Sequence, residues 1–182
     1  DIDTDKPIGH ITVNNEEGIY LATSHLIKKG CTNIGFISSK TVNKLSKERL
    51  EGYKRALREH GFSVDEGKIY LENYSVESGY RGAKYLLDKG DIDGICCGND
   101  LIAIGAIRLL KEKGIKIPDE VKVIGFDDIS ISKYIDPPLT TIAQPIYKIG
   151  QEAVNMLLSI IEKKRTSLHK VLDLKLIERG SC

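Results

Sequence analysis

The segment Val121-Lys-Val-Ile-Gly-Phe-Asp-Asp-Ile129 decides the fold of this chain. Its first four residues are β-branched and apolar apart from one lysine, a pattern typical of a buried parallel strand. Gly125 and Phe126 are expected to end the strand, so that Asp127 and Asp128 stand where its carboxyl end meets a loop. Ligands of open α/β sheets bind at that edge. A carboxylate there can accept two hydroxyl hydrogen bonds at once, which suits a polyol or a sugar.

A second short strand follows in the segment Asp136-Pro-Pro-Leu-Thr-Thr-Ile-Ala-Gln-Pro145. We expect this strand at 139–142, and it leads to Gln144, another polar group in the same region. Further strands are expected at 9–14, 33–38, 69–73, 93–98 and 171–178, and helices at about 15–29, 46–60, 76–89, 100–113 and 147–164. Strands that alternate with helices of ten or more residues predict βαβ units, a mostly parallel sheet and an α/β fold.

The composition is typical of a soluble globular protein. With 41% hydrophobic and 29% charged residues, the 182-residue chain has enough apolar surface for one domain or two small lobes. No apolar run approaches the roughly 20 residues that span a bilayer, and the acidic first residues show no signal peptide. A net charge of +1 gives no indication of a nucleic-acid surface. The densest basic run, Lys163-Lys164-Arg165, is expected to end a helix, where cations suit the dipole.

The residues that carry metal and catalytic chemistry are scattered. Cys96 and Cys97 are adjacent in an expected strand, where neighbouring side chains point to opposite faces, so a chelating pair is not expected. With Cys31 and Cys182 they are interpreted as buried, inert thiols in a reducing cytoplasm. No histidine has metal-ligand spacing, and no phosphate loop or nucleophile elbow occurs. We therefore expect no catalytic residue, no metal and no cofactor.

Six short motifs occur in one order between residues 13 and 145. They are Val13-Asn-Asn-x-x-Gly18, Arg49-Leu-x-Gly-Tyr53, Glu77-Ser-Gly-Tyr80, Gly98-Asn-Asp100 with Ala103 and Gly105, Val123-Ile-Gly-Phe-Asp-Asp128, and Pro137-Pro-Leu-Thr-Thr141 with Gln144-Pro145. Each motif alone is weak. Together they closely resemble the effector-binding domain of the lactose/galactose repressor (LacI/GalR) family of bacterial transcription regulators, with the ribose-repressor-like branch nearest.

The resemblance implies a two-lobed fold like that of type 1 periplasmic binding proteins, with parallel doubly wound sheets and the effector between the lobes. Members of the family begin with a helix-turn-helix headpiece, a hinge helix and the first strands of the N-terminal lobe. The N-terminal lobe is therefore expected to be incomplete here. We expect residues 1–38 and 145–168 in this partial N-terminal lobe, and residues 39–144 and 169–182 in the C-terminal lobe.

The resemblance also implies two charged effector contacts. Arg49 matches an arginine that reaches into the cleft and donates forked hydrogen bonds, a geometry that lysine does not reproduce. The alternative for Arg49 is a solvated surface arginine. Asp127 matches the carboxylate that binds the effector, and its alternative is to cap the turn after the strand, as Asp128 is also suited to do.

Three neutral residues complete the expected site. Tyr74 matches an aromatic ring that stacks on the effector, or is an ordinary half-buried aromatic residue. Asn99 matches an asparagine that binds a sugar hydroxyl, or caps a helix, and Gln144 is open to a similar choice. Asn43 aligns with an arginine of the purine-responsive branch, and this difference favours a sugar over a purine.

The sequence therefore favours the ligand-sensing domain of a transcriptional repressor and not an enzyme. By resemblance, we expect DNA binding only through the missing helix-turn-helix, and a homodimer through helices at about 76–89 and 101–112. The alternative is a periplasmic sugar-binding protein of a transport system, which shares the fold and the cleft residues. Pro137-Pro-Leu-Thr-Thr141 and the cysteines favour the repressor, hence a cytoplasmic location and no membrane partner.

Overall fold

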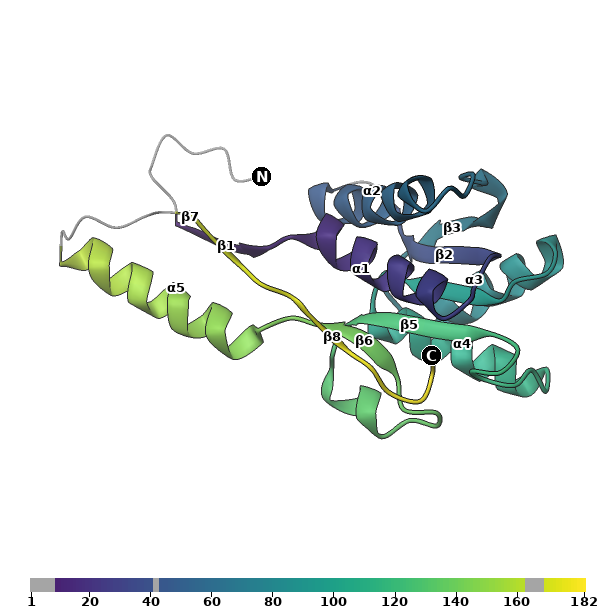
Figure 1. Cartoon of the computed structure of the whole chain (residues 1–182). Coiled ribbons are helices and arrows are strands. Elements are labelled where there is room, and N and C mark those ends of the chain that lie inside the picture. Colours follow the sequence, from purple (N-terminus) through teal and green to yellow (C-terminus); the bar gives the residue numbers. More distant parts are fainter. Residues whose placement is uncertain (1–8, 41–42, 163–168) are drawn as a thin grey trace. The chain divides into compact units, whose positions relative to one another are not determined.

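A computed structural model describes residues 9–40, 43–162 and 169–182. The chain forms two compact units, and Figure 1 shows the order of their elements. The larger unit consists of Asn15–Ala143 and Lys175–Cys182. The smaller unit consists of the residues up to Asn14 and of Gln144–Leu174. Within the described residues, no helix is both long and apolar enough for a membrane span.

A six-stranded sheet forms the centre of the larger unit. Its spatial order is β3, β2, β4, β5, β6 and β8, with the bounds Ile69–Glu72, Ile34–Ser39, Gly94–Cys97, Lys122–Asp127, Thr140–Ala143 and Lys175–Ile177. The first five strands are parallel, and only β8 runs antiparallel to its neighbour β6. The carboxyl ends of β2, β4 and β5 therefore meet at one edge, as the α/β pattern predicts.

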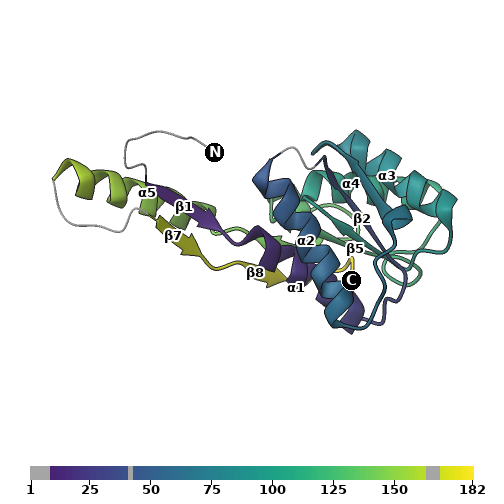
Figure 2. The ribbon, with the colours of Figure 1, turned by 90° about the horizontal axis from the view of Figure 1, so that it is seen from above.

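Two pairs of helices cover the two faces of this sheet. Figure 2 shows α1 (Asn15–Lys28) and α2 (Lys44–Glu59) on one side of β2 and β5, and α3 (Val76–Lys89) and α4 (Asp100–Glu112) on the other. The helices within each pair pack against each other. This arrangement confirms the expected α/β fold with a parallel, doubly wound sheet.

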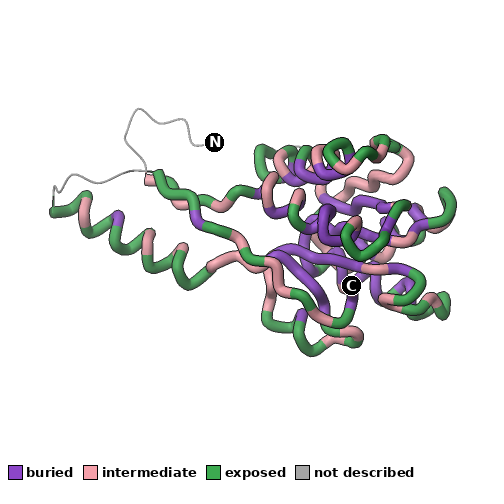
Figure 3. The backbone as a smooth tube through the Cα atoms, viewed as in Figure 1, coloured by how far each residue is buried: buried purple, intermediate pink, exposed green. Residues whose placement is uncertain are grey.

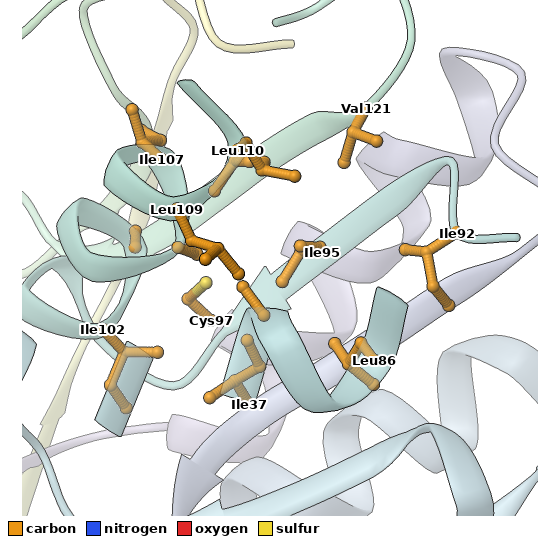
Figure 4. Packing of buried hydrophobic residues seen from close by; sticks show 14 of the residues in the cluster. Ile37, Leu86, Ile92, Ile95, Cys97, Ile102, Ile107, Leu109, Leu110 and Val121 are labelled. Carbon is orange, nitrogen blue, oxygen red and sulfur yellow. The ribbon is translucent and has the colours of Figure 1, made fainter. Parts of the chain in front are cut away.

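The hydrophobic core on the α3–α4 side is continuous. Figure 4 shows Ile37 of β2 and Ile95 and Cys97 of β4 packed against Leu86 of α3 and Leu110 of α4. These side chains are fully buried because the alternating strand positions and the helix stripe both face the same layer. The central strands are consequently almost uninterrupted buried segments in Figure 3.

Side-chain caps fix the starts of three helices of the larger unit. The side chains of Asn43, Ser75 and Asn99 accept hydrogen bonds from the backbone N–H groups three residues ahead. The cap at Asn99 is one of the two interpretations that the sequence offered for this residue. The second helix begins at Lys44, two residues before the expected start at about Ser46, because Asn43 caps it.

The smaller unit contains a two-stranded parallel sheet and one helix. β1 (His10–Val13) pairs with β7 (His169–Leu172), and α5 (Ile146–Ile161) packs near β1. Much of α5 is exposed (Figure 3), and several of its exposed residues are apolar. A cavity of about 280 Å³ is lined by Gly9, Ile11 and residues of α5. The expected helix end at Lys163-Lys164-Arg165 lies outside the described residues.

The units divide the chain at points that differ from the expected lobe boundaries. Residues 15–38 were expected in the N-terminal lobe, but α1 packs against α2, and β2 lies between β3 and β4 in the larger unit. The expected C-terminal strand at 171–178 is two strands, because the chain passes from the smaller to the larger unit between Leu174 and Lys175. Which units correspond to which lobes stays a proposal.

Candidate functional site

The candidate site lies at the carboxyl edge of the sheet in the larger unit. Asp127 is the last residue of β5, which runs three residues further than the expected end at Ile124. Gly98 and Asn99 follow the neighbouring strand β4 directly, and β4 pairs with β5 in parallel. Arg49, in the second turn of α2, reaches the same edge. Residues from distant parts of the sequence thus come together where ligands of such sheets bind.

The guanidinium of Arg49 is the centre of the site. Only 3% of this residue is exposed. Its Nε donates to Asn15 Oδ1 at 3.1 Å, and one terminal nitrogen donates to the carbonyl of Gly98 at 2.5 Å. The other terminal nitrogen lies 3.5 Å from Asp127 Oδ1. The alternative of a solvated surface arginine is therefore wrong, since a buried cation needs such partners.

Two aromatic rings contact this cation. The central carbon of the Arg49 guanidinium lies 4.0 Å from the centre of the Phe126 ring and 5.5 Å from that of Tyr74. Cation–π contacts of this kind contribute roughly 0.5–2 kcal/mol, with the larger values at desolvated sites. The Tyr74 hydroxyl also lies 3.3 Å from the hydroxyl of Ser46. Tyr74 therefore belongs to the Arg49 cluster, whereas its expected stacking on an effector stays a proposal.

The backbone that carries Asp127 is strained. Asp127 and Asp128 have φ angles of 114° and 55°, so two successive residues that are not glycine adopt the left-handed region. Such conformations cost of the order of 1–3 kcal/mol each and persist where the surroundings fix them. Asp128 forms an ion pair with Arg179 at 2.7 Å. The side chain of Asp127 is 26% exposed, which leaves its carboxylate within reach of a ligand.

Asn99 and Gln144 differ from the Arg49 cluster. Asn99 is buried, and its Oδ1 accepts the backbone N–H of Ile102 at 3.0 Å. It is therefore a helix cap, as its alternative interpretation held, although the cap does not use its amide N–H donors. Gln144 belongs to the smaller unit, where its backbone carbonyl accepts the N–H of Ile146. An effector contact by either residue stays a proposal.

Three contributors to the site were not expected as such. Asn15 and Gly98 were expected only as members of motifs, and Phe126 only as a strand end. Asn15 Nδ2 donates to Glu48 at 3.3 Å, so the same amide accepts from Arg49 and donates to a carboxylate. The signal for Asn15 was its place at the junction of a strand and a helix, where polar groups gather at a sheet edge.

The described residues contain no cluster of His, Cys, Asp and Glu that suits a metal ion. The four cysteine thiols are expected to be unreactive. Burial raises the pKa of the Cys31 thiol to about 11 and that of the Cys96 and Cys182 thiols to about 12, and it holds the pKa of Cys97 well above its ordinary value. Thiols of this kind carry little thiolate near neutral pH and are poor nucleophiles.

The sequence and the fold of this chain are similar to those of known proteins. A model described as periplasmic binding protein-like domain matches residues 23–182. The crystal structure of the Escherichia coli transcriptional repressor ascG superposes with a TM-score of 0.90 at 31% identity, and the match covers 98% of this chain and 70% of that protein. A LacI-family regulator from Enterococcus faecium with bound ribose gives 0.87 at 31% identity, covering 98% and 67% of the two chains.

This chain belongs to the lactose/galactose repressor (LacI) family. It is 36% identical over 182 residues to the HTH-type transcriptional regulator RegA of Clostridium saccharobutylicum, covering 98% of this chain and 55% of RegA. It is 41% identical over 154 residues to the HTH-type transcriptional repressor PurR of Actinobacillus pleuropneumoniae, covering 84% of this chain and 46% of PurR. The LacI-family chain thus spans about half the length of these curated relatives.

Proposed function

We propose that this chain is the effector-sensing domain of a bacterial transcriptional repressor. It binds a small sugar or sugar-like molecule at the Asp127 edge of the larger unit and thereby changes operator binding by a headpiece outside this chain. The buried Arg49 beside the partly exposed carboxylate of Asp127 is the observation that carries this proposal. The relatives described above are regulators, which favours a sensor over an enzyme and over a transport protein.

The distance between the two charged groups suits hydroxyl groups. Arg49 and Asp127 are 3.5 Å apart, which is longer than the 2.7–2.9 Å of a short charge-assisted hydrogen bond. A hydroxyl that donates to Asp127 and accepts from Arg49 forms shorter contacts with both groups. Two adjacent hydroxyls of a sugar present donors and acceptors at such spacing. The nearby ring of Tyr74 offers an apolar face for the sugar's C–H surface.

The charges at this edge favour an uncharged effector. Arg49 faces Asp127, and Arg179 forms an ion pair with Asp128. Because both guanidiniums already face carboxylates, a phosphorylated sugar would add a negative charge beside two acidic side chains. A neutral pentose or hexose avoids that repulsion.

Asn43 supports a sugar over a purine. It stands where we align an arginine of the purine-responsive branch, and in the structure it caps α2 by accepting the N–H of Ser46 at 2.9 Å. An asparagine used in this way does not supply the cationic donor expected for a purine carbonyl. The Enterococcus faecium relative was solved with ribose, so a pentose is the first candidate.

Regulation by such a sensor needs two states and, in this family, two copies. A sugar shifts the balance between states by its different affinity for each of them. We propose a homodimer in which the N-terminus of α4 and the short helix η2 (Ser130–Lys133) lie at the interface. Leu101 of α4, Ile131 of η2 and Tyr134 directly after η2 are 38%, 48% and 72% exposed. The hydrogen bonds from Ile129 and Ser132 to Asp100 hold the two elements beside each other, so we propose that these side chains form one apolar contact surface. A repressor that binds DNA acts in the cytoplasm, where buried thiols stay reduced.

A thermal-shift screen of the full-length protein tests the effector proposal. The screen uses pentoses, hexoses, sugar phosphates and purine bases, because a ligand at 100 times its Kd stabilises the folded state by about 2.7 kcal/mol. We expect a neutral sugar to raise the Tm of the wild type but not of Asp127→Asn.

The matched control is Asp136→Asn, which removes a carboxylate whose side chain is 88% exposed on the surface. This variant should keep the full shift. A response to purines alone would contradict the preference for sugars, and the absence of any shift would contradict the proposed effector class. A shift that survives in Asp127→Asn would place the site elsewhere.

A further inference from the structure

The carboxylate of Asp100 is fully buried at the first residue of α4. Its Oδ2 accepts the backbone N–H of Ile129 at 2.9 Å and the hydroxyl of Ser132 at 2.6 Å. Its Oδ1 accepts the hydroxyl of Thr141 at 2.6 Å. A single side chain thus joins α4 to the segment after β5, to η2 and to β6. None of the proposed effector contacts uses it.

Keeping this carboxylate in the core has an energetic cost. Burial raises the pKa of Asp100, while hydrogen bonds from Ser132, Thr141 and Ile129 oppose the rise, and the charge of Asp127 adds to it. The cap of α4 is already supplied by Asn99, so helix capping does not account for Asp100. The three hydrogen bonds that Asp100 accepts must therefore have a role other than starting α4.

The segment that Asp100 holds is the strained one. Asp127 and Asp128 occupy the left-handed region, and Ile129 is the next residue along the chain. Beyond it, the backbone N–H of Leu139 bonds to the carbonyl of Ser132 at 2.8 Å, which ties η2 back to the start of β6. Strained backbone persists when its neighbours fix it from several sides. Asp100 supplies two of the hydrogen bonds that hold this segment, one to Ile129 directly after the turn and one to Ser132 in η2.

β5 is also shaped to the carboxylate. A Cβ atom on Gly125 would lie 2.2 Å from Asp100 Oδ1, far inside van der Waals contact. Any side chain at position 125 would therefore displace Asp100 or the strand two residues before Asp127. Two motif residues therefore accommodate Asp100. Gly125 of the Val-Ile-Gly-Phe-Asp motif leaves room for its carboxylate, and Thr141 of the Pro-Pro-Leu-Thr-Thr motif donates a hydrogen bond to it.

We infer that Asp100 is a positioning residue for the proposed effector site. By holding Ile129 and Ser132, it fixes the turn that directs the carboxylate of Asp127 toward Arg49. The inference rests on the proposed function for its ligand, but its effect on the turn is measurable without any ligand. Asp100 touches no effector atom in this proposal and acts only through Asp127.

Two hydroxyls offer a matched pair of variants. Ser132 and Thr141 are both fully buried, and each donates to Asp100 at 2.6 Å. Ser132→Ala removes a bond on the side of the Asp127 turn, whereas Thr141→Val removes one on the side of β6. Each variant deletes one hydroxyl and spares the carboxylate, which avoids the unfolding that Asp100→Ala risks. A general role in packing predicts equal effects, and a positioning role predicts unequal ones.

The measurement is hydrogen exchange of residues 127–132 in the ligand-free full-length protein, followed by titration with D-ribose. We expect Ser132→Ala to speed exchange of this segment at least about fivefold and to weaken ribose binding by about 5–10-fold. Thr141→Val should stay within about twofold of the wild type in both measurements.

Two results distinguish this inference from the proposed function. Equal acceleration of exchange by both variants, or by neither, would show that Asp100 contributes only to packing and would overturn the inference. Faster exchange in Ser132→Ala alone, with no binding of ribose by the wild type, would support the positioning role. It would at the same time contradict ribose as the effector.

Discussion

Each nitrogen of the Arg49 guanidinium faces a different group. Asn15 and the carbonyl of Gly98 hold two of the nitrogens, and the third is directed at Asp127. The ring of Phe126 lies 4.0 Å away and covers the plane. A lysine has a single nitrogen and therefore cannot reproduce this arrangement. The orientation of the Arg49 guanidinium is thus fixed before a ligand arrives, which lowers the entropic cost of binding.

His25 gives the molecule a pH dependence at the residue scale. It is buried on α1, and burial lowers its pKa, while Glu178 at 3.9 Å raises it and Lys29 and Lys28 lower it. Since the pKa in the folded state lies below 6.5, the unfolded chain binds this proton more readily. The stability that His25 contributes is therefore fully present above about pH 6.5 and is lost as the pH falls through the folded-state pKa.

Urea unfolding at pH 7.5, 6.5 and 5.5 checks this dependence. We expect the free energy of unfolding of the wild type to fall more steeply on acidification than that of His25→Gln, which has no proton to bind. Parallel decreases in the two proteins would contradict the assignment to His25.

The charged residues of the site were open to prediction, but their partners were not. Arg49 and Asp127 stand in motifs beside expected element ends, so their meeting at one edge follows from a parallel sheet. The bond from Arg49 to Asn15 joins residues 34 positions apart, and the bond from Thr141 to Asp100 joins residues 41 apart. Such pairings depend on how helices sit against strands, which the local pattern does not specify. The positive φ of Asp127 likewise follows from tertiary contacts, since its local sequence favours an ordinary strand end.

At the scale of elements, α3 and α4 cross without intervening side chains. A Cβ on Gly105 would lie 1.9 Å from the carbonyl oxygen of Val76, and one on Gly79 would lie 2.0 Å from that of Ile102. The two helices therefore approach each other backbone to backbone. This close approach lets α4 bring its N-terminal residue Asp100 against β5 and β6.

We expect Gly105→Ala to destabilise the larger unit by about 1–3 kcal/mol, because the methyl group forces the helices apart. Gly150→Ala is the control, since a Cβ there meets nothing within 4 Å. In the interior of α5 it should stabilise the helix by about 0.5–1 kcal/mol. Urea unfolding of both variants measures the difference, and similar effects at the two positions would contradict the close crossing.

Element positions followed well from the sequence, and the errors have local causes. Periodicity and glycine stops placed α1, α3 and α4 within one or two residues of their observed bounds. The end of β5 was placed too early, because glycine usually weakens a strand and here it accommodates Asp100. The break between β7 and β8 has no turn signal of its own, since the chain there simply leaves one unit for the other.

At the scale of the whole molecule, the proposed dimer surface has a natural control. Leu101 and Leu45 are each the second residue of a helix, α4 and α2, and are 38% and 37% exposed. An aspartate in either first turn suits the helix dipole equally. The two helices lie on opposite faces of the sheet (Figure 2), so only one of them belongs to the proposed interface.

We expect Leu101→Asp to convert the proposed dimer of the full-length protein to monomer at micromolar concentration, since it buries a charge in an apolar contact. Leu45→Asp should sediment like the wild type. A dimeric Leu101→Asp protein, or a monomeric wild type, in sedimentation velocity would contradict this interface.

The division into two units was the least accessible part of the fold. Residues 15–38 follow β1 without a linker rich in proline, glycine or serine, so the sequence shows no boundary at Asn14. The boundary exists because β2 pairs with β3 and β4, while β1 pairs with β7 from the far end of the chain. Strand partners at such separation are invisible to periodicity, which reports only neighbours along the chain.

The pairing of β1 with β7 sets an order in time as the protein is made. His10 must wait for His169, which leaves the ribosome roughly 160 residues later, or about 8–30 s at 5–20 residues per second. Within the described residues β1 pairs only with β7, whereas β2, β3, β4 and β5 can pair one after another as they emerge. An unpaired strand edge invites association with other chains. Until His169 emerges, the edge of β1 that later pairs with β7 is open to such association, although the parallel strands of the larger sheet have already left the ribosome.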